Sequence, residues 1–177
     1  ITSDPKGESK FLFIPRDCGN YAHQEPRIIN APKGFVFHHL NAWEDSNHVV
    51  IDSIFYKDFP TIEPNEDFRK IDFEKLPEGI LKSCKVNLVK KESDTKILSD
   101  QCCEFAMVNP IKQGLKARFS WMATAYKKSG NGPLQSIKKL DLLNGESYYW
   151  NAAPYGFVSE PLIIPKVDSK SEDDGWV

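Results

Sequence analysis

The sequence predicts an all-β protein, and three observations lead to that prediction. Aromatic and β-branched residues gather in runs of strand length. Several of these runs alternate apolar and polar residues with the period of two typical of a half-buried strand. Turn-forming residues separate the runs, and the spacing of an amphipathic helix is scarce. A chain of 177 residues with 40% hydrophobic content is sufficient for one globular domain.

The first pair of strands is predicted at residues 35–43 (FVFHHLNAW) and 48–56 (HVVIDSIFY). Both runs are rich in the aromatic and β-branched side chains that favour strands. The four residues between them, 44–47 (EDSN), suit a hairpin loop. We therefore expect the two strands to pair antiparallel.

Further strands are predicted at 80–89 and 117–125, where apolar residues recur at every second position. Asn144-Gly145 separates the run 134–143 from 147–150 and favours a hairpin with a type I′ turn. Prolines confine residues 60–78 to short helical turns, and the polar tail 165–175 suggests a surface loop. Roughly nine short strands are compatible with a sandwich, a barrel or propeller blades, among which the pattern does not choose.

Composition argues against two broad classes of partner. Lys and Arg (23) nearly balance Asp and Glu (25), which gives a net charge of -2. The chain therefore lacks the basic field that holds nucleic acid or an anionic membrane surface, and no nucleic-acid partner is expected. Its longest apolar runs are far shorter than the roughly 18 residues that span a bilayer.

The cysteines and the two ends of the chain suggest a piece of a cytoplasmic protein. The four cysteines, of which Cys102 and Cys103 are adjacent, lack the spacing of a disulfide framework, so we expect free thiols in a reducing cytoplasm. Neither of these two cysteines has a base nearby in sequence, which disfavours a nucleophilic role. The chain begins without a methionine and stops where an apolar segment begins, so residues 1–177 are interpreted as a partial domain, truncated at both ends.

Two histidines, His38 and His39, lie inside a strongly apolar strand. Strict alternation places His38 on the face of Val36 and His39 on the face of Phe37. Two histidines on opposite faces do not bind one metal together, so at most one of them is a ligand. From the strand alone, a hydrogen-bonded structural histidine remains the alternative.

Glu104 and Glu160 are each a lone carboxylate among apolar neighbours. A buried carboxylate is costly unless it is paired or hydrogen-bonded, so each requires a partner such as an imidazole or backbone amides. A position at the rim, facing water, is the alternative for both. The acidic run 172–174 lacks the ligand spacing of an EF-hand, and we expect it to be a solvated loop.

Together these residues resemble the C-terminal part of the carotenoid cleavage oxygenases. The similarity covers nearly the whole chain and begins with FIPR at 13–16. It continues in order with FVFHHLNAWE at 35–44, EF at 104–105 before NP at 109–110, SEP at 159–161, and EDDGWV at 172–177. The segment from GNGPL at 130–134 to GFVSEP at 156–161 most resembles the cyanobacterial apocarotenoid-cleaving branch.

The resemblance implies a seven-bladed β-propeller whose axis holds Fe(II) bound by four histidines, of which this chain supplies roughly three blades. By position, His38 matches an iron ligand, and His39 matches none. Glu104 and Glu160 match glutamates that accept hydrogen bonds from ligand histidines. Phe37 and Phe105 match aromatic residues of the substrate tunnel, with ordinary core packing as the alternative. The other three ligands are expected outside this chain.

The resemblance also implies an activity. In such proteins Fe(II) and O2 cleave one carbon–carbon double bond of an apocarotenoid to give two aldehydes. The expected partners are therefore an apolar polyene and O2, with peripheral membrane contact through segments outside this chain. A stilbene-cleaving dioxygenase of the same family and a metal-free propeller that acts as a binding module remain the alternatives.

Overall fold

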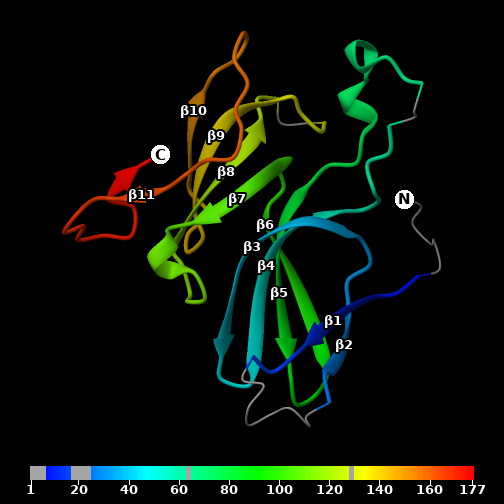
Figure 1. The fold of residues 1–177 in the computed structure, drawn as a ribbon, viewed down its shortest axis with the longest axis vertical. Helices are drawn as coiled ribbons and strands as arrows, with labels where there is room; N and C mark the ends of the chain where they lie inside the picture. The colour runs from blue at the N-terminus through cyan, green and yellow to red at the C-terminus, as the bar shows by residue number, and fades with distance from the viewer. Residues whose placement is uncertain (1–6, 17–24, 63–64, 128–129) are drawn as a thin grey trace.

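The computed structural model describes residues 7–16, 25–62, 65–127 and 130–177, and within them the chain is almost entirely β (Figure 1). It consists of short antiparallel strands and single turns of 3-10 helix. The elements in chain order are β1 (Ser9–Phe13), β2 (Arg27–Ala31), β3 (Phe35–Asp45), β4 (His48–Tyr56), η1 (Phe68–Lys70), η2 (Phe73–Lys75), β5 (Ile80–Asn87), β6 (Glu92–Ser99), β7 (Cys103–Val108), η3 (Pro110–Lys112), β8 (Phe119–Ala125), β9 (Leu134–Asp141), β10 (Ser147–Asn151), β11 (Ile164–Pro165) and β12 (Gly175–Trp176).

Two four-stranded antiparallel sheets dominate the structure. The first blade is β3-β4-β5-β6, and the second blade is β7-β8-β9-β10, each a meander in which successive strands pair. Figure 1 shows the blades side by side, with β7 of the second blade lying against β3 and β4 of the first. Two shorter pairs, β1-β2 and β11-β12, complete the described sheets. This arrangement is that of neighbouring blades in a β-propeller.

Buried side chains from the two blades meet in one core. Ile54 and Leu81 of the first blade and Met122 of the second are each 0% exposed in this cluster. A smaller cluster, formed by Ile29, Ile51 and neighbouring residues, lies between β1-β2 and the other face of the first blade. Strand β4 is therefore apolar on both faces, which explains its nearly continuous apolar run.

The predicted hairpins are confirmed, but their turns differ in detail. The β3-β4 turn contains only Ser46 and Asn47, because Asp45 pairs with His48 across it. In the β9-β10 hairpin, Gly145 has a positive φ of 80°, whereas Asn144 is not among the residues with positive φ. A type I′ turn needs positive φ at both central positions, so the predicted turn type is wrong.

The segment 60–78 contains the short helical turns expected of it. The Asp67 carboxylate accepts the backbone N–H of Arg69 at the start of η1, and the Asp72 carboxylate accepts that of Glu74 at the start of η2. Each aspartate thus satisfies a backbone donor that a helix terminus leaves unpaired.

The acidic tail is docked on the second blade, which corrects the expectation of a solvated loop. The Glu172 carboxylate accepts the backbone N–H groups of Arg118 (2.9 Å) and Phe119 (2.7 Å). The Asp173 carboxylate lies 2.5 Å from the ammonium of Lys139 on β9. The negative charges are therefore used to hold the tail against the sheet.

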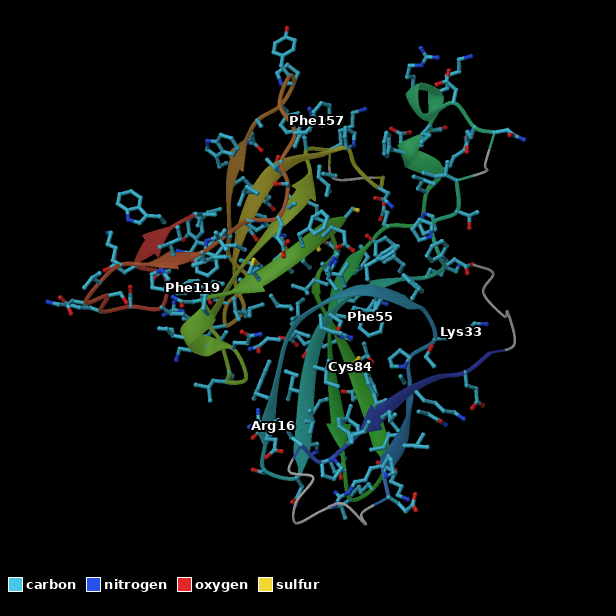
Figure 2. All side chains as sticks on the ribbon, in the orientation of Figure 1. Arg16, Lys33, Phe55, Cys84, Phe119 and Phe157 are labelled. Atoms are coloured by element: carbon cyan, nitrogen blue, oxygen red, sulfur yellow. The ribbon has the colours of Figure 1, made fainter. Side chains whose placement is uncertain are left out.

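Two expectations from composition agree with the described residues. Cys84, Cys102 and Cys103 are free thiols in the interior, and Figure 2 marks Cys84 within the first blade. Burial raises the pKa of Cys102 to about 11 and that of Cys103 to about 12, so neither is a thiolate at neutral pH. Within the described part of the chain, every helix is too short or too polar to cross a membrane.

Candidate functional site

The site is built around a hydrogen bond that joins the two blades. His38 on β3 and Glu104 on β7 are 66 positions apart in sequence, yet His38 Nδ1 lies 2.5 Å from Glu104 Oε2. Glu104 is only 9% exposed, whereas the side chain of His38 is 42% exposed. Nδ1 of the imidazole is therefore held by the protein, while the rest of the ring remains partly accessible.

Two more donors hold the Glu104 carboxylate. The hydroxyl of Tyr56 donates to Glu104 Oε1 at 2.7 Å, and the backbone N–H of Phe105 donates to Oε2 at 3.0 Å. Burial and the neighbouring carboxylate raise the pKa of Tyr56 above its ordinary value, so the hydroxyl keeps its proton. The requirement that a buried Glu104 find partners is thereby met.

This geometry selects one tautomer of His38. A carboxylate oxygen only accepts hydrogen bonds, so His38 Nδ1 carries the proton and donates to Glu104. In the neutral ring, the lone pair of Nε2 is then free to bind a metal ion. His38 is thus in the form that a metal ion requires of an imidazole ligand.

Irregularities in both strands bring these side chains together. The pairing of β3 with β4 shifts register between Val36 and His39, and the pairing of β7 with β8 shifts between Glu104 and Met107. Phe105, inside the second irregularity, has a φ of 54°. Positive φ is strained for a bulky residue, and bulges redirect side chains at functional sites.

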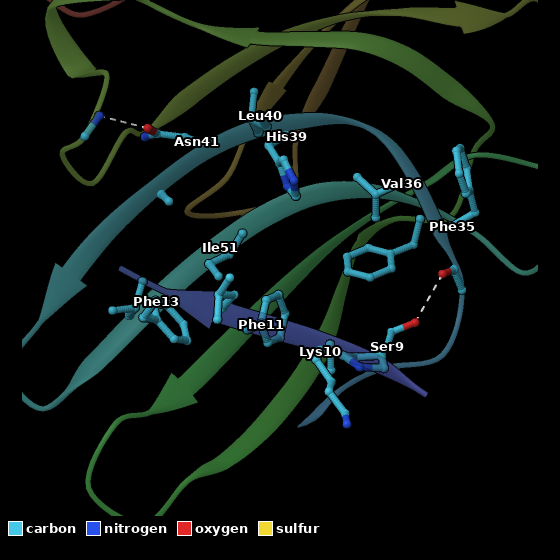
Figure 3. A pocket seen from close by; sticks show the side chains of 18 of the residues that line it. Ser9, Lys10, Phe11, Phe13, Phe35, Val36, His39, Leu40, Asn41 and Ile51 are labelled. Carbon is cyan, nitrogen blue, oxygen red and sulfur yellow. Dashed lines mark hydrogen bonds between the residues drawn. The ribbon is translucent and has the colours of Figure 1, made fainter. Parts of the chain in front are cut away.

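His39 lies on the opposite side of β3 and serves a different purpose. Its Nδ1 is 2.6 Å from Ser53 Oγ, and it borders a cavity of about 820 Å³ under β1 (Figure 3). Val36 lines the same cavity, whereas the ring of Phe37 packs against Tyr56, on the side of Glu104. The two histidine side chains bond to different partners, Glu104 and Ser53, although both residues border a cavity of about 170 Å³. Strict alternation assigns Val36 and Phe37 to the wrong histidines, because the register shift intervenes.

The predicted aromatic residues both lie near His38. The Phe105 ring centroid is 5.0 Å from that of His38. Phe37 is 45% exposed and makes edge-on contacts with Phe35 and Tyr56 at 4.6 and 5.4 Å. Phe37 therefore combines a packed edge with an accessible surface, and its part in substrate binding stays a prediction.

Glu160 approaches the same region without a partner of its own. Together with His38 and Phe105, it lines a cavity of about 170 Å³. Its side chain is exposed, and its carboxylate hydrogen-bonds to none of the described residues. Its predicted role toward a ligand histidine thus stays a prediction, and any such histidine must come from elsewhere.

The described residues fit part of a metal site. His38 offers a correctly protonated imidazole, but no group of at least three His, Cys, Asp or Glu residues within these ranges could hold an ion. At the start of β4, His48 is 3.2 Å from the side-chain amide of Asn87, and His23 lies outside the described residues. Among the described residues, His38 is thus a candidate for a single ligand, whereas a metal centre needs several.

Comparison with known proteins identifies the family. The whole chain, residues 1–177, matches the family described as RPE65, retinal pigment epithelial membrane protein. The chain belongs to this carotenoid oxygenase family. It is 35% identical over 173 residues to the apocarotenoid-15,15'-oxygenase of Synechocystis sp., covering 98% of this chain and 34% of that protein. It is 28% identical to the human beta,beta-carotene 15,15'-dioxygenase, with 80% of this chain and 31% of that protein covered.

Solved structures of the carotenoid oxygenase family share the fold. The cobalt-substituted Synechocystis apocarotenoid oxygenase superimposes with a TM-score of 0.90 at 34% identity, over 98% of this chain and 35% of that one. Those structures are β-propellers, which confirms the fold predicted from the resemblance. The chain spans about a third of the length of these relatives.

One residue of this candidate site, Tyr56, was not predicted from the sequence. It ends a predicted strand in the run IFY, where an aromatic residue suggests nothing beyond core packing. Its partner Glu104 is 48 positions away, on another blade. No local pattern could have indicated that contact.

Proposed function

We propose that the protein containing this chain is a ferrous-iron dioxygenase that cleaves one carbon–carbon double bond of an apocarotenoid. One polyene and one O2 give two aldehydes, because each carbon of the broken double bond receives one oxygen atom. The observation that carries the proposal is the His38–Glu104 hydrogen bond between two blades. It occurs in a chain 35% identical to an apocarotenoid-15,15'-oxygenase.

In this proposal the residues of the chain orient one ligand. Ferrous iron, when bound, supplies the position at which O2 is activated. His38 offers Nε2 to that iron, while Glu104 accepts the Nδ1 hydrogen and fixes the direction of the ring. The remaining ligands come from parts of the protein outside the described residues.

Phe37 and Phe105 form the apolar side of the same site. Both rings are close to the His38–Glu104 pair, and Phe37 keeps almost half of its surface accessible. Aromatic faces of this kind bind an apolar polyene and exclude water from it. We therefore assign them to the substrate and give them no part in holding the metal.

The test uses the full-length protein. The metal-free protein is loaded with Fe(II) and incubated in air with an apocarotenal, and the products are separated and identified by mass. We expect two aldehydes whose combined carbon count equals that of the substrate, and no turnover without iron. An iron-loaded protein that leaves every apocarotenal intact contradicts the proposal.

Two other outcomes correspond to the alternatives. Cleavage of a hydroxystilbene in place of the apocarotenal would indicate the stilbene-cleaving branch. Retention of a polyene without any bound metal would indicate a binding module. The protonation of His38 toward Glu104 favours the metal-dependent activity over the latter.

A further inference from the structure

We propose that Tyr56 is a positioning residue that acts on the metal site through Glu104. Its hydroxyl, bonded to Glu104 Oε1, holds the plane of the carboxylate in which Oε2 accepts from His38. The inference rests on the proposed function, since His38 is taken as a metal ligand. It adds a residue two hydrogen bonds away from the metal, on a strand that contributes no ligand.

The phenol of Tyr56 is itself held rigidly. Tyr56 is 3% exposed, and its ring meets the Phe37 ring edge-on, with centroids 5.4 Å apart at 89°. At Gly79 there is no side chain, and a Cβ there would lie 2.7 Å from both the Tyr56 hydroxyl and its ring carbon Cζ. Glycine is thus required beside the ring, and the hydroxyl has little freedom to move.

The hydroxyl determines what the carboxylate can do. Oε2 of Glu104 is bound by both His38 and the Phe105 N–H, whereas Oε1 has Tyr56 as its described partner. Without that hydroxyl, the buried Oε1 loses its hydrogen-bond donor. The carboxylate is then free to rotate toward another donor. His38 would then lose the fixed acceptor that sets its tautomer and ring direction.

A purely structural role makes a different prediction. If Tyr56 only filled the core, phenylalanine would serve equally well, because the ring contacts with Phe37 and Gly79 do not involve the hydroxyl hydrogen bond. Tyr56→Phe therefore separates positioning from packing. Tyr149→Phe is the matched control, since the Tyr149 hydroxyl also donates to a side-chain oxygen, Gln101 Oε1 at 2.9 Å, remote from His38.

The experiment titrates the metal-free full-length protein with Co(II) and follows its visible absorption. We expect Tyr56→Phe to weaken Co(II) binding by roughly 3- to 10-fold, below the 10- to 100-fold typical of a direct hydrogen-bond partner of a ligand, and to shift the absorption band. Tyr149→Phe should leave both unchanged. Thermal melting of the metal-free proteins checks that neither variant loses its fold.

A second pair of variants tests the route of the effect. If Tyr56 acts through Glu104, then Tyr56→Phe should add nothing to Glu104→Gln. Additive losses would overturn the positioning role, as would a Tyr56→Phe protein that binds Co(II) like the wild type with the same spectrum. A wild-type protein that binds no metal would instead overturn the proposed function, and the positioning role with it.

Discussion

His38 shows how much a single imidazole depends on its neighbours. Its ring is nearly half exposed, so packing alone does not fix it, and its direction comes from Glu104. Glu104 is in turn held by Tyr56 and by the N–H of Phe105. The orientation of the accessible His38 ring therefore depends on the buried residues that hold Glu104.

We expect His38→Ala in the full-length protein to abolish or severely weaken iron binding and turnover. His39→Ala should leave iron content near that of the wild type and lower stability instead, because His39 bonds Ser53 on the other face of β3. Metal analysis and turnover of both variants provide the measurement. Normal activity in His38→Ala would contradict the assignment of this residue.

Glu104→Gln is expected to reduce iron affinity or rate by roughly 10- to 100-fold while the fold is retained. An amide is neutral and a weaker acceptor for the His38 N–H, so the ring is held less firmly. The same loss is expected for Glu160→Gln if a ligand histidine reaches it. Glu92→Gln, on the exposed edge strand β6, is the control and should change neither quantity.

Asp52 provides a pH-dependent prediction. It is 2% exposed, and its Oδ1 has no hydrogen-bond partner among the described residues. Burial raises its pKa to about 6, partly offset by a hydrogen bond from Ser83. Its ionised form thus costs stability above pH 6, and this cost diminishes as the pH falls and vanishes below the unfolded-state pKa of 3.8. Replacing the carboxylate with a neutral group should therefore stabilise the protein most at high pH.

Accordingly, the free energy of unfolding of Asp52→Asn minus that of the wild type should be higher at pH 8 than at pH 4.5, by about 2 kcal/mol. Urea unfolding at the two pH values measures the change. A pH-independent difference for Asp52→Asn would mean that Asp52 is already protonated, or fully solvated, throughout this range.

At the scale of elements, the sequence predicted the hairpins well and the irregularities poorly. The β3-β4 pair is evident because aromatic and β-branched residues mark both strands. Strand β6 (ESDTKILS) was not predicted as an individual element, because an exposed edge strand shows no apolar alternation. The register shifts in β3 and β7 leave no local pattern, yet they determine which side chains meet at Glu104.

The candidate site could be predicted only in part from the sequence. His38 and Glu104 stood out because each is a polar residue in an apolar run, and the structure brings them together. Tyr56 did not stand out, since its function comes from a contact between blades. Glu160 shares a cavity with His38, but its carboxylate has no hydrogen-bond partner among the described residues, so its role stays a prediction.

The docked tail makes a prediction about one carboxylate. Glu172→Ala should destabilise the protein by about 1–3 kcal/mol, because the backbone N–H groups of Arg118 and Phe119 lose their acceptor. Asp174→Ala is the control within the same segment. It removes only an exposed ion pair with Lys166, worth at most about 1 kcal/mol. Equal melting temperatures for the two variants would contradict the docking role.

At the scale of the whole molecule, the second blade has an exposed apolar surface. Tyr148, Trp150 and Leu162 are 57%, 63% and 64% exposed and border a groove of about 740 Å³ on the second blade. A second cavity, of about 820 Å³, opens on the other side of the first blade. In a propeller the face that carries the groove of the second blade is covered by a neighbouring blade, and the chain spans only a third of the length of its relatives.

We therefore expect residues 1–177, expressed alone, to be poorly soluble or to associate, because sheet faces and edges are exposed. The same chain should lack tight iron binding, since one histidine does not replace a full set of ligands. Size-exclusion chromatography and metal analysis test the two parts. A soluble monomer with one equivalent of iron would contradict both, together with the role of His38 as one ligand among several.

The bond between His38 and Glu104 has a mechanical consequence, because its two ends belong to different blades. A fluctuation that separates the blades at this point therefore stretches this bond. The orientation of the imidazole is therefore a local measure of the spacing between blades. A substitution in the shared core, for example at Leu81 or Met122, would alter the orientation of His38 by changing that spacing.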